Sequence, residues 1–179
     1  KLIFIFNLKR KLLGELAKLN LKKFDTLLLH NVEDLRLNQY RLPLLKEMKK
    51  LKSENLISKI GVSIYDTEDL KIVLKNFKPD VIQLPVNVLD QRFLKKNIIK
   101  KIKKNKIEIN ARSIFLRGNL LNNNELKSDK VYKKVREFEK WCKFKDVDKV
   151  SACVNFVRKH KFINNIILGI DNKIQLEKI

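Results

Sequence analysis

The sequence predicts an α/β protein, and three observations favour a (β/α)8 barrel, of which the chain is expected to be the carboxyl-terminal part, from about strand 4 to strand 8. Apolar segments of strand length alternate with helical segments along the 179 residues, as in parallel sheets with right-handed crossovers. A doubly wound sheet, the alternative, should open on a G-x-G-x-x-G turn after a strand, and the sequence has none. Polar residues end the apolar segments, where barrels carry their active sites: His30, Ser63, Gln83, Arg112 and Ser113.

The first half of the chain shows the alternation most clearly. Residues 8–19 place Leu12, Leu16 and Leu19 at helical spacing. Asp66 or Thr67 stands where a side-chain oxygen would accept a hydrogen bond from a first-turn amide of a helix. The expected elements, in order, are a helix at 8–19, a strand at 24–30, a helix at 44–56, a strand at 59–64, a helix at 68–76 and a strand at 80–84.

The second half repeats the pattern. The helix expected over residues 128–143 carries Val135, Phe138 and Trp141 at helical spacing, which predicts that these side chains belong to the core. The remaining expected elements are a helix at 92–104, a strand at 107–113, a helix at 150–159, a strand at 166–168 and a helix at 172–179.

Composition limits the class of protein. The chain has 41 Lys and Arg against 20 Asp and Glu, a formal charge of +21 that first suggests a nucleic-acid partner. Only 8 of the basic residues are Arg, however, and 33 Lys, 19 Ile and 18 Asn together indicate an A/T-rich coding bias. We therefore expect nucleic-acid binding to be unlikely, and the lysines of residues 95–106 to form a solvated outer helix face.

Length and cysteine content add further expectations. The chain is predicted to be one partial barrel domain over residues 1–179, because complete barrels have about 250 residues and the sequence begins at Lys1 rather than Met. Two cysteines do not make a disulfide framework, which fits a cytoplasmic location. No apolar stretch reaches the roughly 18 residues of a membrane helix, so we expect no membrane partner.

Five motifs follow one another in a family-specific order. They are DTLLLHN at residues 25–31, IGVS at 60–63, IQLP at 82–85, ARSIFLRG at 111–118, and Gly169 with the Gln175-Leu176 pair. Together they resemble the aldo-keto reductases, NAD(P)H-dependent (β/α)8 enzymes that reduce carbonyl groups. The resemblance covers nearly the whole chain and implies a small-molecule aldehyde or ketone as substrate.

The resemblance also implies roles for particular residues. His30 would be the active-site histidine that orients and polarises the substrate carbonyl. Ser63 and Gln83 would hold the nicotinamide carboxamide, although the neighbour of Ser63 is Ile64 where members often have Asn. Arg112 takes a position where many members stack an aromatic ring on the nicotinamide. The remaining cofactor positions are Ser113, Leu116 and Gly118 along the pyrophosphate, and Asp171, Asn172 and Gln175 at the adenosine phosphate.

The resemblance leaves the proton donor unassigned. The family's catalytic Tyr, Lys and Asp lie on the first three strands, and Tyr40, Tyr65 and Tyr132 all follow His30. The fragment alone is therefore expected to be inactive. NADP is favoured over NAD, since a basic adenosine pocket suits the extra phosphate. The sequence does not indicate an oligomeric state.

Physical chemistry without the resemblance leaves alternatives open. His30, after three leucines, would by pattern be a core or capping histidine, and His160 would be a solvated helix end. Arg112 at a strand end requires an anion, a carboxylate or solvent. Cys142 and Cys153 lie too far from any His to form a metal-ligand pattern, so we predict no metal. Two further functional classes remain, a non-catalytic relative that binds cofactor or a partner, and a basic nucleic-acid-binding protein.

Overall fold

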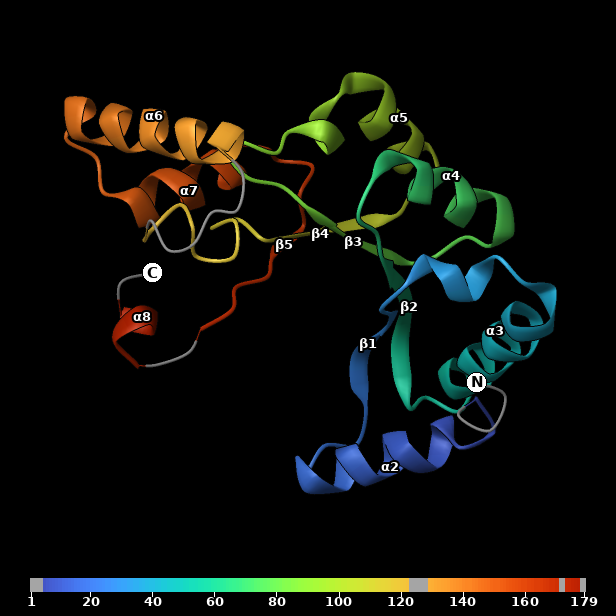
Figure 1. Ribbon diagram of the computed structural model, residues 1–179. Coiled ribbons are helices and arrows are strands. Elements are labelled where there is room, and N and C mark those ends of the chain that lie inside the picture. Colours follow the sequence, from blue (N-terminus) through green and yellow to red (C-terminus); the bar gives the residue numbers. More distant parts are fainter. Residues whose placement is uncertain (1–4, 123–128, 171–172, 178–179) are drawn as a thin grey trace. The chain divides into compact units, whose positions relative to one another are not determined.

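The five expected strands are present in the computed structural model, which describes residues 5–122, 129–170 and 173–177 (Figure 1). The sheet order is β1-β2-β3-β4-β5, and the β1–β2, β2–β3 and β4–β5 pairs are parallel. The expectation of an α/β fold with parallel pairing is therefore confirmed. The strands are β1 (Phe24–Leu29), β2 (Ile57–Ser63), β3 (Val81–Pro85), β4 (Glu108–Arg112) and β5 (Asn165–Ile166).

Helices alternate with these strands as the periodicity predicts. A capping box begins the helix after β2, because the Asp66 carboxylate accepts from the amides of Glu68 and Asp69 at 2.8 and 3.0 Å. Asp66, rather than Thr67, is therefore the cap. The helices are α2 (Leu8–Lys18), η1 (Val32–Leu35), α3 (Asn38–Ser53), α4 (Thr67–Asn76), η2 (Arg92–Leu94), α5 (Lys96–Lys104), α6 (Asp129–Lys145), α7 (Lys149–Arg158) and α8 (Lys173–Glu177).

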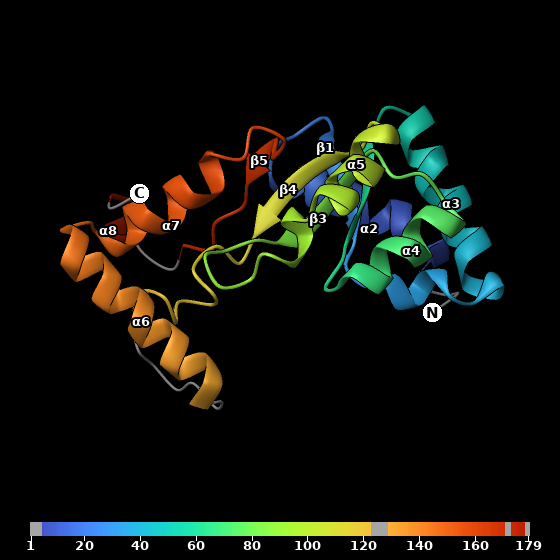
Figure 2. The ribbon, with the colours of Figure 1, turned by 90° about the horizontal axis from the view of Figure 1, so that it is seen from above.

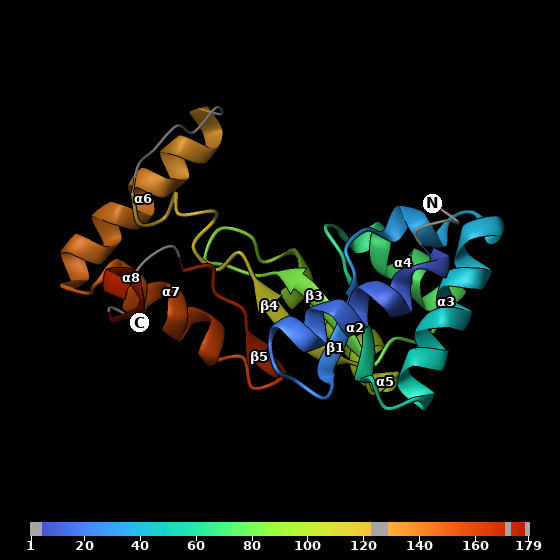
Figure 3. The ribbon, with the colours of Figure 1, turned by 90° about the horizontal axis from the view of Figure 1, so that it is seen from below.

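The chain divides into two compact units. The first comprises Lys1–Gln83 and Lys101–Glu108, and the second comprises Leu84–Lys100 and Ile109–Ile179. In the first unit, α3 packs on β2, and η1 contacts both α3 and α4. Figures 2 and 3 show α3 and α4 next to each other. Its buried apolar side chains include Leu35, Met48, Leu51, Val62, Leu70 and Val73.

The second unit has its own core, to which α6 and α7 contribute, and these two helices contact each other (Figure 1). Its buried members are Leu120, Val135, Phe138, Cys142 and Cys153. Both cysteines are free thiols, and burial raises the pKa of Cys153 to about 12. The prediction that Trp141 belongs to the core is wrong. Its side chain is 49% exposed and stacks on Phe138 with ring centroids 6.3 Å apart.

Left-handed residues other than glycine end four helices. Asn20, Asn55, Lys106 and Asp146 have φ between +50° and +58°, a conformation that usually falls to glycine at a helix end. In each case the next amide donates back into the last turn, as Leu56 does to the Leu51 carbonyl at 3.0 Å. Asn55 thus ends α3 at Ser53, earlier than the expected end at residue 56. The chain has only four glycines, so polar residues take this role.

Several predicted boundaries are wrong for identifiable reasons. α3 starts six residues before the expected 44, because Arg41 bonds the Asn38 and Asn76 side chains and the Leu35 carbonyl, which holds its first turn. The expected helix over 92–104 divides into η2 and α5, because Lys95 has extended backbone.

The last two strands are shorter than expected. β4 stops at Arg112 because Ser113 has φ of +57°, which no strand residue adopts. β5 is Asn165–Ile166 instead of 166–168, and the ladder to β4 is supplemented by the side chain of Asn164, whose Oδ1 accepts from the Ile109 amide at 2.9 Å. α6 and α7 differ from expectation by one or two residues at each end.

Candidate functional site

In the first unit, polar side chains lie at the carboxyl ends of two adjacent strands. Ser63 ends β2 and is the register partner of Gln83 on β3. The Ser63 hydroxyl is 3% exposed and donates to Gln83 Oε1 at 3.3 Å. The structure therefore brings together the two residues that the sequence assigns to one ligand group. Ile64, fully buried, follows them and donates its backbone amide to the Gln83 carbonyl at 2.9 Å.

Gln83 retains unused hydrogen-bonding capacity. Its side chain is half-buried, and its Oε1 accepts from Ser63. Within the described residues, Gln83 Nε2 has no hydrogen-bond acceptor. An amide N–H₂ that faces neither a protein acceptor nor the core is able to donate to a ligand carbonyl.

His30 follows β1 directly and is exposed. The alternative prediction, that His30 is a core or capping histidine, is therefore wrong, because the side chain is exposed and does not cap the next helix. The Asn31 side chain takes that role, because its Oδ1 accepts from the Glu33 amide at 2.9 Å at the start of η1. The register pairs Leu29 with Val62, so His30 and Ser63 each come one residue after a paired position. No bond to the His30 ring is found among the residues that the structure describes.

The second unit carries the other predicted positions. Arg112 ends β4, its side chain is half-buried, and its guanidinium donates to the Ser113 hydroxyl at 3.1 Å. The Arg112 carbonyl accepts from the Val86 amide at 3.1 Å. A turn follows Arg112 and extends through Gly118.

The backbone of this turn, residues 113–118, is left-handed at four positions. Ser113 has φ of +57°, and Leu116, Arg117 and Gly118 follow with +49°, +55° and +84°. Left-handed backbone costs a non-glycine residue roughly 1–2 kcal/mol, and such strain concentrates at functional sites. Phe115 and Leu116 pack against the second unit's core and hold the turn in place.

Backbone amides are the main polar groups of the 113–118 turn. The amide of Leu116 donates to the Ser113 carbonyl at 2.9 Å. The amides of Phe115, Arg117 and Gly118, by contrast, have no acceptor within the part of the chain that the structure describes. Successive unpaired amides in turn conformations form anion-binding concavities. This arrangement suits a phosphate group.

Asn87 is a residue that sequence analysis missed. It is 1% exposed, and its side chain bonds the backbone of residues 89, 90 and 113. The available signal was the segment after Pro85, where Asn and Asp stand three residues apart between a strand and a helix, the composition of an Asx turn.

The carboxyl-terminal positions are only partly described. Asp171 and Asn172 lie outside the described residues. Gln175 lies in α8, and its side chain is not among those described. Their predicted role at an adenosine phosphate stays a prediction.

The described residues hold no candidate for a membrane span or a metal centre. No helix there is long and apolar enough to span a bilayer. No group of three or more His, Cys, Asp or Glu side chains is arranged to hold a metal ion in the same residues.

Comparisons with known proteins bear on the family and the fold of the chain. The model of the Aldo/keto reductase family matches residues 7–179. The chain resembles the apo form of the aldo-keto reductase AKR11C1 from Bacillus halodurans, with a TM-score of 0.75 and 18% identity over 98% of this chain. The holo form of that protein has a TM-score of 0.71 at 18% identity over 95%. A search of curated proteins found no match.

A second solved relative shares the fold. The glycerol dehydrogenase AKR11B4 from Gluconobacter oxydans has a TM-score of 0.68 and 18% identity over 96% of this chain. The chain spans 61%, 58% and 57% of the three solved chains, in the order given. The expectation of a partial (β/α)8 barrel is confirmed by these matches.

Proposed function

The chain belongs to the aldo/keto reductase family, and we propose that it binds NADP, or NAD, in an oxidoreductase that reduces a small aldehyde or ketone by hydride transfer. The observation that carries the proposal is the Ser63–Gln83 pair, bonded at 3.3 Å at the ends of two adjacent strands. Because the chain spans about 60% of its solved relatives, the activity of the whole enzyme is part of the proposal.

The Ser63–Gln83 pair fits a primary carboxamide. Such a group has both a carbonyl and an N–H₂, and Gln83 Nε2 is a donor without a protein acceptor in the described residues. The Gln83 Oε1 has a second lone pair that remains available to an N–H donor. Holding a carboxamide at both atoms orients the attached ring, so Ser63 and Gln83 would select which ring face points to the substrate.

The 113–118 turn fits the phosphates of a dinucleotide. Three backbone amides lack acceptors among the described residues, and Arg112 adds a guanidinium at the start of the turn. Charge-assisted bonds from amides and guanidinium to phosphate are short and strong. The exposed Arg117 offers a second cation on the same turn. NADP is favoured over NAD because a basic adenosine pocket suits the extra phosphate.

When bound, a reduced nicotinamide supplies the hydride. His30 would act on the substrate, because an exposed imidazole N–H at a strand end can donate to a carbonyl oxygen and stabilise the charge that develops there. The general acid that would protonate this oxygen is not assigned to any residue of this chain. We also propose that the enzyme is cytoplasmic and has neither a nucleic-acid nor a membrane partner.

Substitution at Gln83 tests the carboxamide site. Gln83→Met keeps the length of the side chain but removes its donor and acceptor. Loss of one or two hydrogen bonds should raise the Kd for NADPH about tenfold, measured by isothermal titration calorimetry on the 179-residue chain. The Kd for ADP-ribose, which has the phosphates but no carboxamide, should not change.

Gln39→Met is the matched control, because Gln39 is exposed on α3 in the same unit. It should leave both affinities at the wild-type value. Equal loss of NADPH and ADP-ribose binding in Gln83→Met would contradict the assignment of Gln83 to the carboxamide. A wild-type chain that binds neither compound would contradict the proposed function in this chain.

A further inference from the structure

Asn87 is one of two buried polar residues in the described part of the chain, together with Ser63. It lies in the connection between β3 and η2, a segment in which neither the motifs nor the proposed function assigns a role. A buried amide that lacked partners would be costly, so its contacts indicate what the side chain does.

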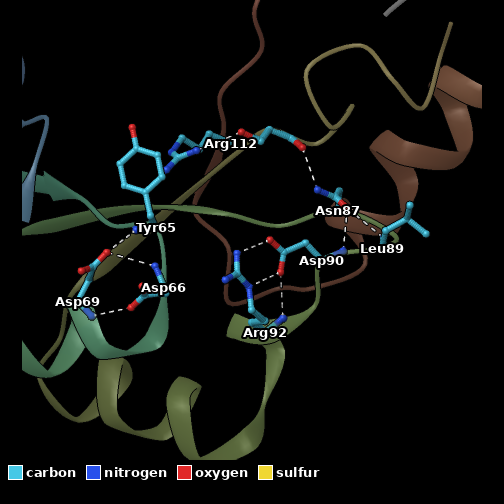
Figure 4. A network of polar contacts seen from close by, with 9 residues as sticks. Tyr65, Asp66, Asp69, Asn87, Leu89, Asp90, Arg92 and Arg112 are labelled. Carbon is cyan, nitrogen blue, oxygen red and sulfur yellow. Dashed lines mark hydrogen bonds and ion pairs between the residues drawn. The ribbon is translucent and has the colours of Figure 1, made fainter. Parts of the chain in front are cut away.

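The carbonyl side of Asn87 closes its own loop. Its Oδ1 accepts from the amides of Leu89 and Asp90 at 2.9 and 2.8 Å, and its backbone amide donates to the Asp90 carbonyl at 3.1 Å (Figure 4). Arg92 binds both carboxylate oxygens of Asp90 at 2.8 Å. Residues 87–92 therefore form a turn braced by side chains at both ends.

The amide side of Asn87 reaches a different segment. Its Nδ2 donates to the Ser113 carbonyl at 3.1 Å, 26 residues away in sequence (Figure 4). The same carbonyl accepts the Leu116 amide at 2.9 Å. Both donors hold this carbonyl in the direction that the left-handed φ of Ser113 requires.

Packing links the same two segments. Val88 and Leu89 contact the apolar core of the second unit, and so do Phe115 and Leu116. The 87–92 and 113–118 turns therefore rest on one core and are joined by one side-chain hydrogen bond. Without that bond, the Ser113 carbonyl would keep only the local Leu116 amide, and the strained backbone would have less to hold it.

We propose that Asn87 is a positioning residue, whose side-chain amide holds the Ser113 carbonyl and so keeps the unpaired amides of Phe115, Arg117 and Gly118 arranged for a dinucleotide pyrophosphate. The inference rests on the proposed function, because it assigns a use to the turn. Asn87 itself touches no ligand in this account and acts only through Ser113.

The test uses Asn87→Asp in the 179-residue chain. The carboxylate still accepts from the Leu89 and Asp90 amides but has no N–H for Ser113. We expect the Kd for ADP-ribose, measured by calorimetry well below the melting temperature, to rise about tenfold. The shifts that ADP-ribose causes in the wild-type amide resonances of Phe115, Arg117 and Gly118 should be lost.

Asn97→Asp is the control for charge, because Asn97 is exposed in the first turn of α5 in the same unit and its Oδ1 accepts from the Ile98 amide. It should bind ADP-ribose as the wild type does. A second variant, Asn87→Ser, is neutral, and its hydroxyl can accept from the same turn but is too short for Ser113. This variant should lose ADP-ribose affinity to the same extent, and it tests the inference even if Asn87→Asp does not fold.

The outcomes separate the two proposals. Folded Asn87 variants that bind ADP-ribose with wild-type affinity and shifts would overturn the role of Asn87, while the proposed function stands. A wild-type chain whose 115–118 amides do not respond to ADP-ribose would overturn both. In the wild type, the Asn87 side-chain amide resonance should move with these amides, and a resonance that stays still on saturation would also count against the inference.

Discussion

The amino and carboxyl ends of the same strands in the first unit differ in how their polar groups are partnered. At the amino ends, Lys59 on β2 pairs with Glu108 at 3.0 Å and with Asp25 at 3.8 Å. Asp80, just before β3, accepts from Lys52 at 2.6 Å and from the Ile60 amide at 2.8 Å. These charges are compensated within the protein.

The carboxyl ends have fewer internal partners. His30 is exposed, and Gln83 Nε2 has no acceptor in the described residues. In the second unit the same holds for amides that follow the carboxyl end of β4, at Arg117 and Gly118. Charged groups are therefore paired at the amino ends, whereas polar groups without an internal partner in the described residues lie at the carboxyl ends, as expected where a ligand completes the bonding.

The largest expected effect comes from a substitution in the middle of β2 that disrupts its packing against the adjacent strands. An added Cβ at Gly61, in the middle of β2, would contact Leu28 Cδ2 and lie 2.8 Å from the Val81 carbonyl oxygen. Gly61→Ala should lower the free energy of unfolding by about 3 kcal/mol, measured by urea denaturation. Gly14→Ala is the control, because nothing lies within 4 Å of its Cβ. It should stabilise α2 by about 0.5–1 kcal/mol, and equal stability of the two variants would contradict the packing described.

A substitution at the carboxyl end should affect binding as well as stability. Gly118 has φ of +84° with open space around its Cβ position, so Gly118→Ala introduces backbone strain without a clash. We expect a loss of about 1–2 kcal/mol in unfolding free energy and weaker ADP-ribose binding. Gly169→Ala also meets nothing within 4 Å, and Gly169 is not left-handed. If both alanine variants behave alike, the left-handed turn is not the source of the effect.

Charge removal at the amino ends should change stability but not binding. Burial raises the pKa of Asp80, but the Ile60 amide and Lys52 lower it by more, so the net pKa lies below 3.8. The unfolded chain then binds this proton more readily, and the stabilisation is present above pH 3.8 and lost as the pH falls through the folded pKa. Asp80→Asn should cost about 0.5–1 kcal/mol at neutral pH. This difference should shrink in denaturation curves below pH 3.8, and a constant difference would contradict the pairing.

The smallest effect on stability is expected at His160, which precedes β5. Burial lowers the pKa of His160, and Lys159 lowers it further, so the expectation of a solvated histidine is wrong. The neutral ring packs between Phe156 and Phe162, each centroid 5.4 Å away. Stability should fall as the pH drops below 6.5, where the unfolded state takes up the proton first. His160→Phe should reduce this acid sensitivity by about 2 °C in melting temperature, and an unchanged pH profile would contradict the assignment.

Periodicity was sufficient to predict the strands and most helices. Alternation of apolar segments placed β1 to β4 within two residues of their bounds, because burial of one face is a local signal. The same apolar segments also predicted which polar residues lie at the strand ends. Ser63 and Gln83 therefore lie next to each other in the structure, as their positions and the family resemblance predicted.

Features that depend on backbone conformation or distant contacts were not predictable from the sequence. Ser113 carries no sign of a left-handed φ, so β4 was expected to extend one residue too far. Asn87 acts on a carbonyl 26 residues away, which no local pattern indicates. Trp141 has helical spacing with Phe138, yet α6 buries a narrower face than the pattern suggests, and Trp141 remains 49% exposed.

We propose that the Ser63–Gln83 pair holds a nicotinamide carboxamide and that the 113–118 turn holds phosphates. Amide NMR spectra of the 179-residue chain, recorded during titrations with NADP and with ADP-ribose, test this proposal most directly. We expect the Gln83 side-chain amide to shift only with NADP, and the Arg117 and Gly118 backbone amides to shift with both ligands. Shifts confined to other surfaces, or none in either group at saturating ligand, would contradict the account.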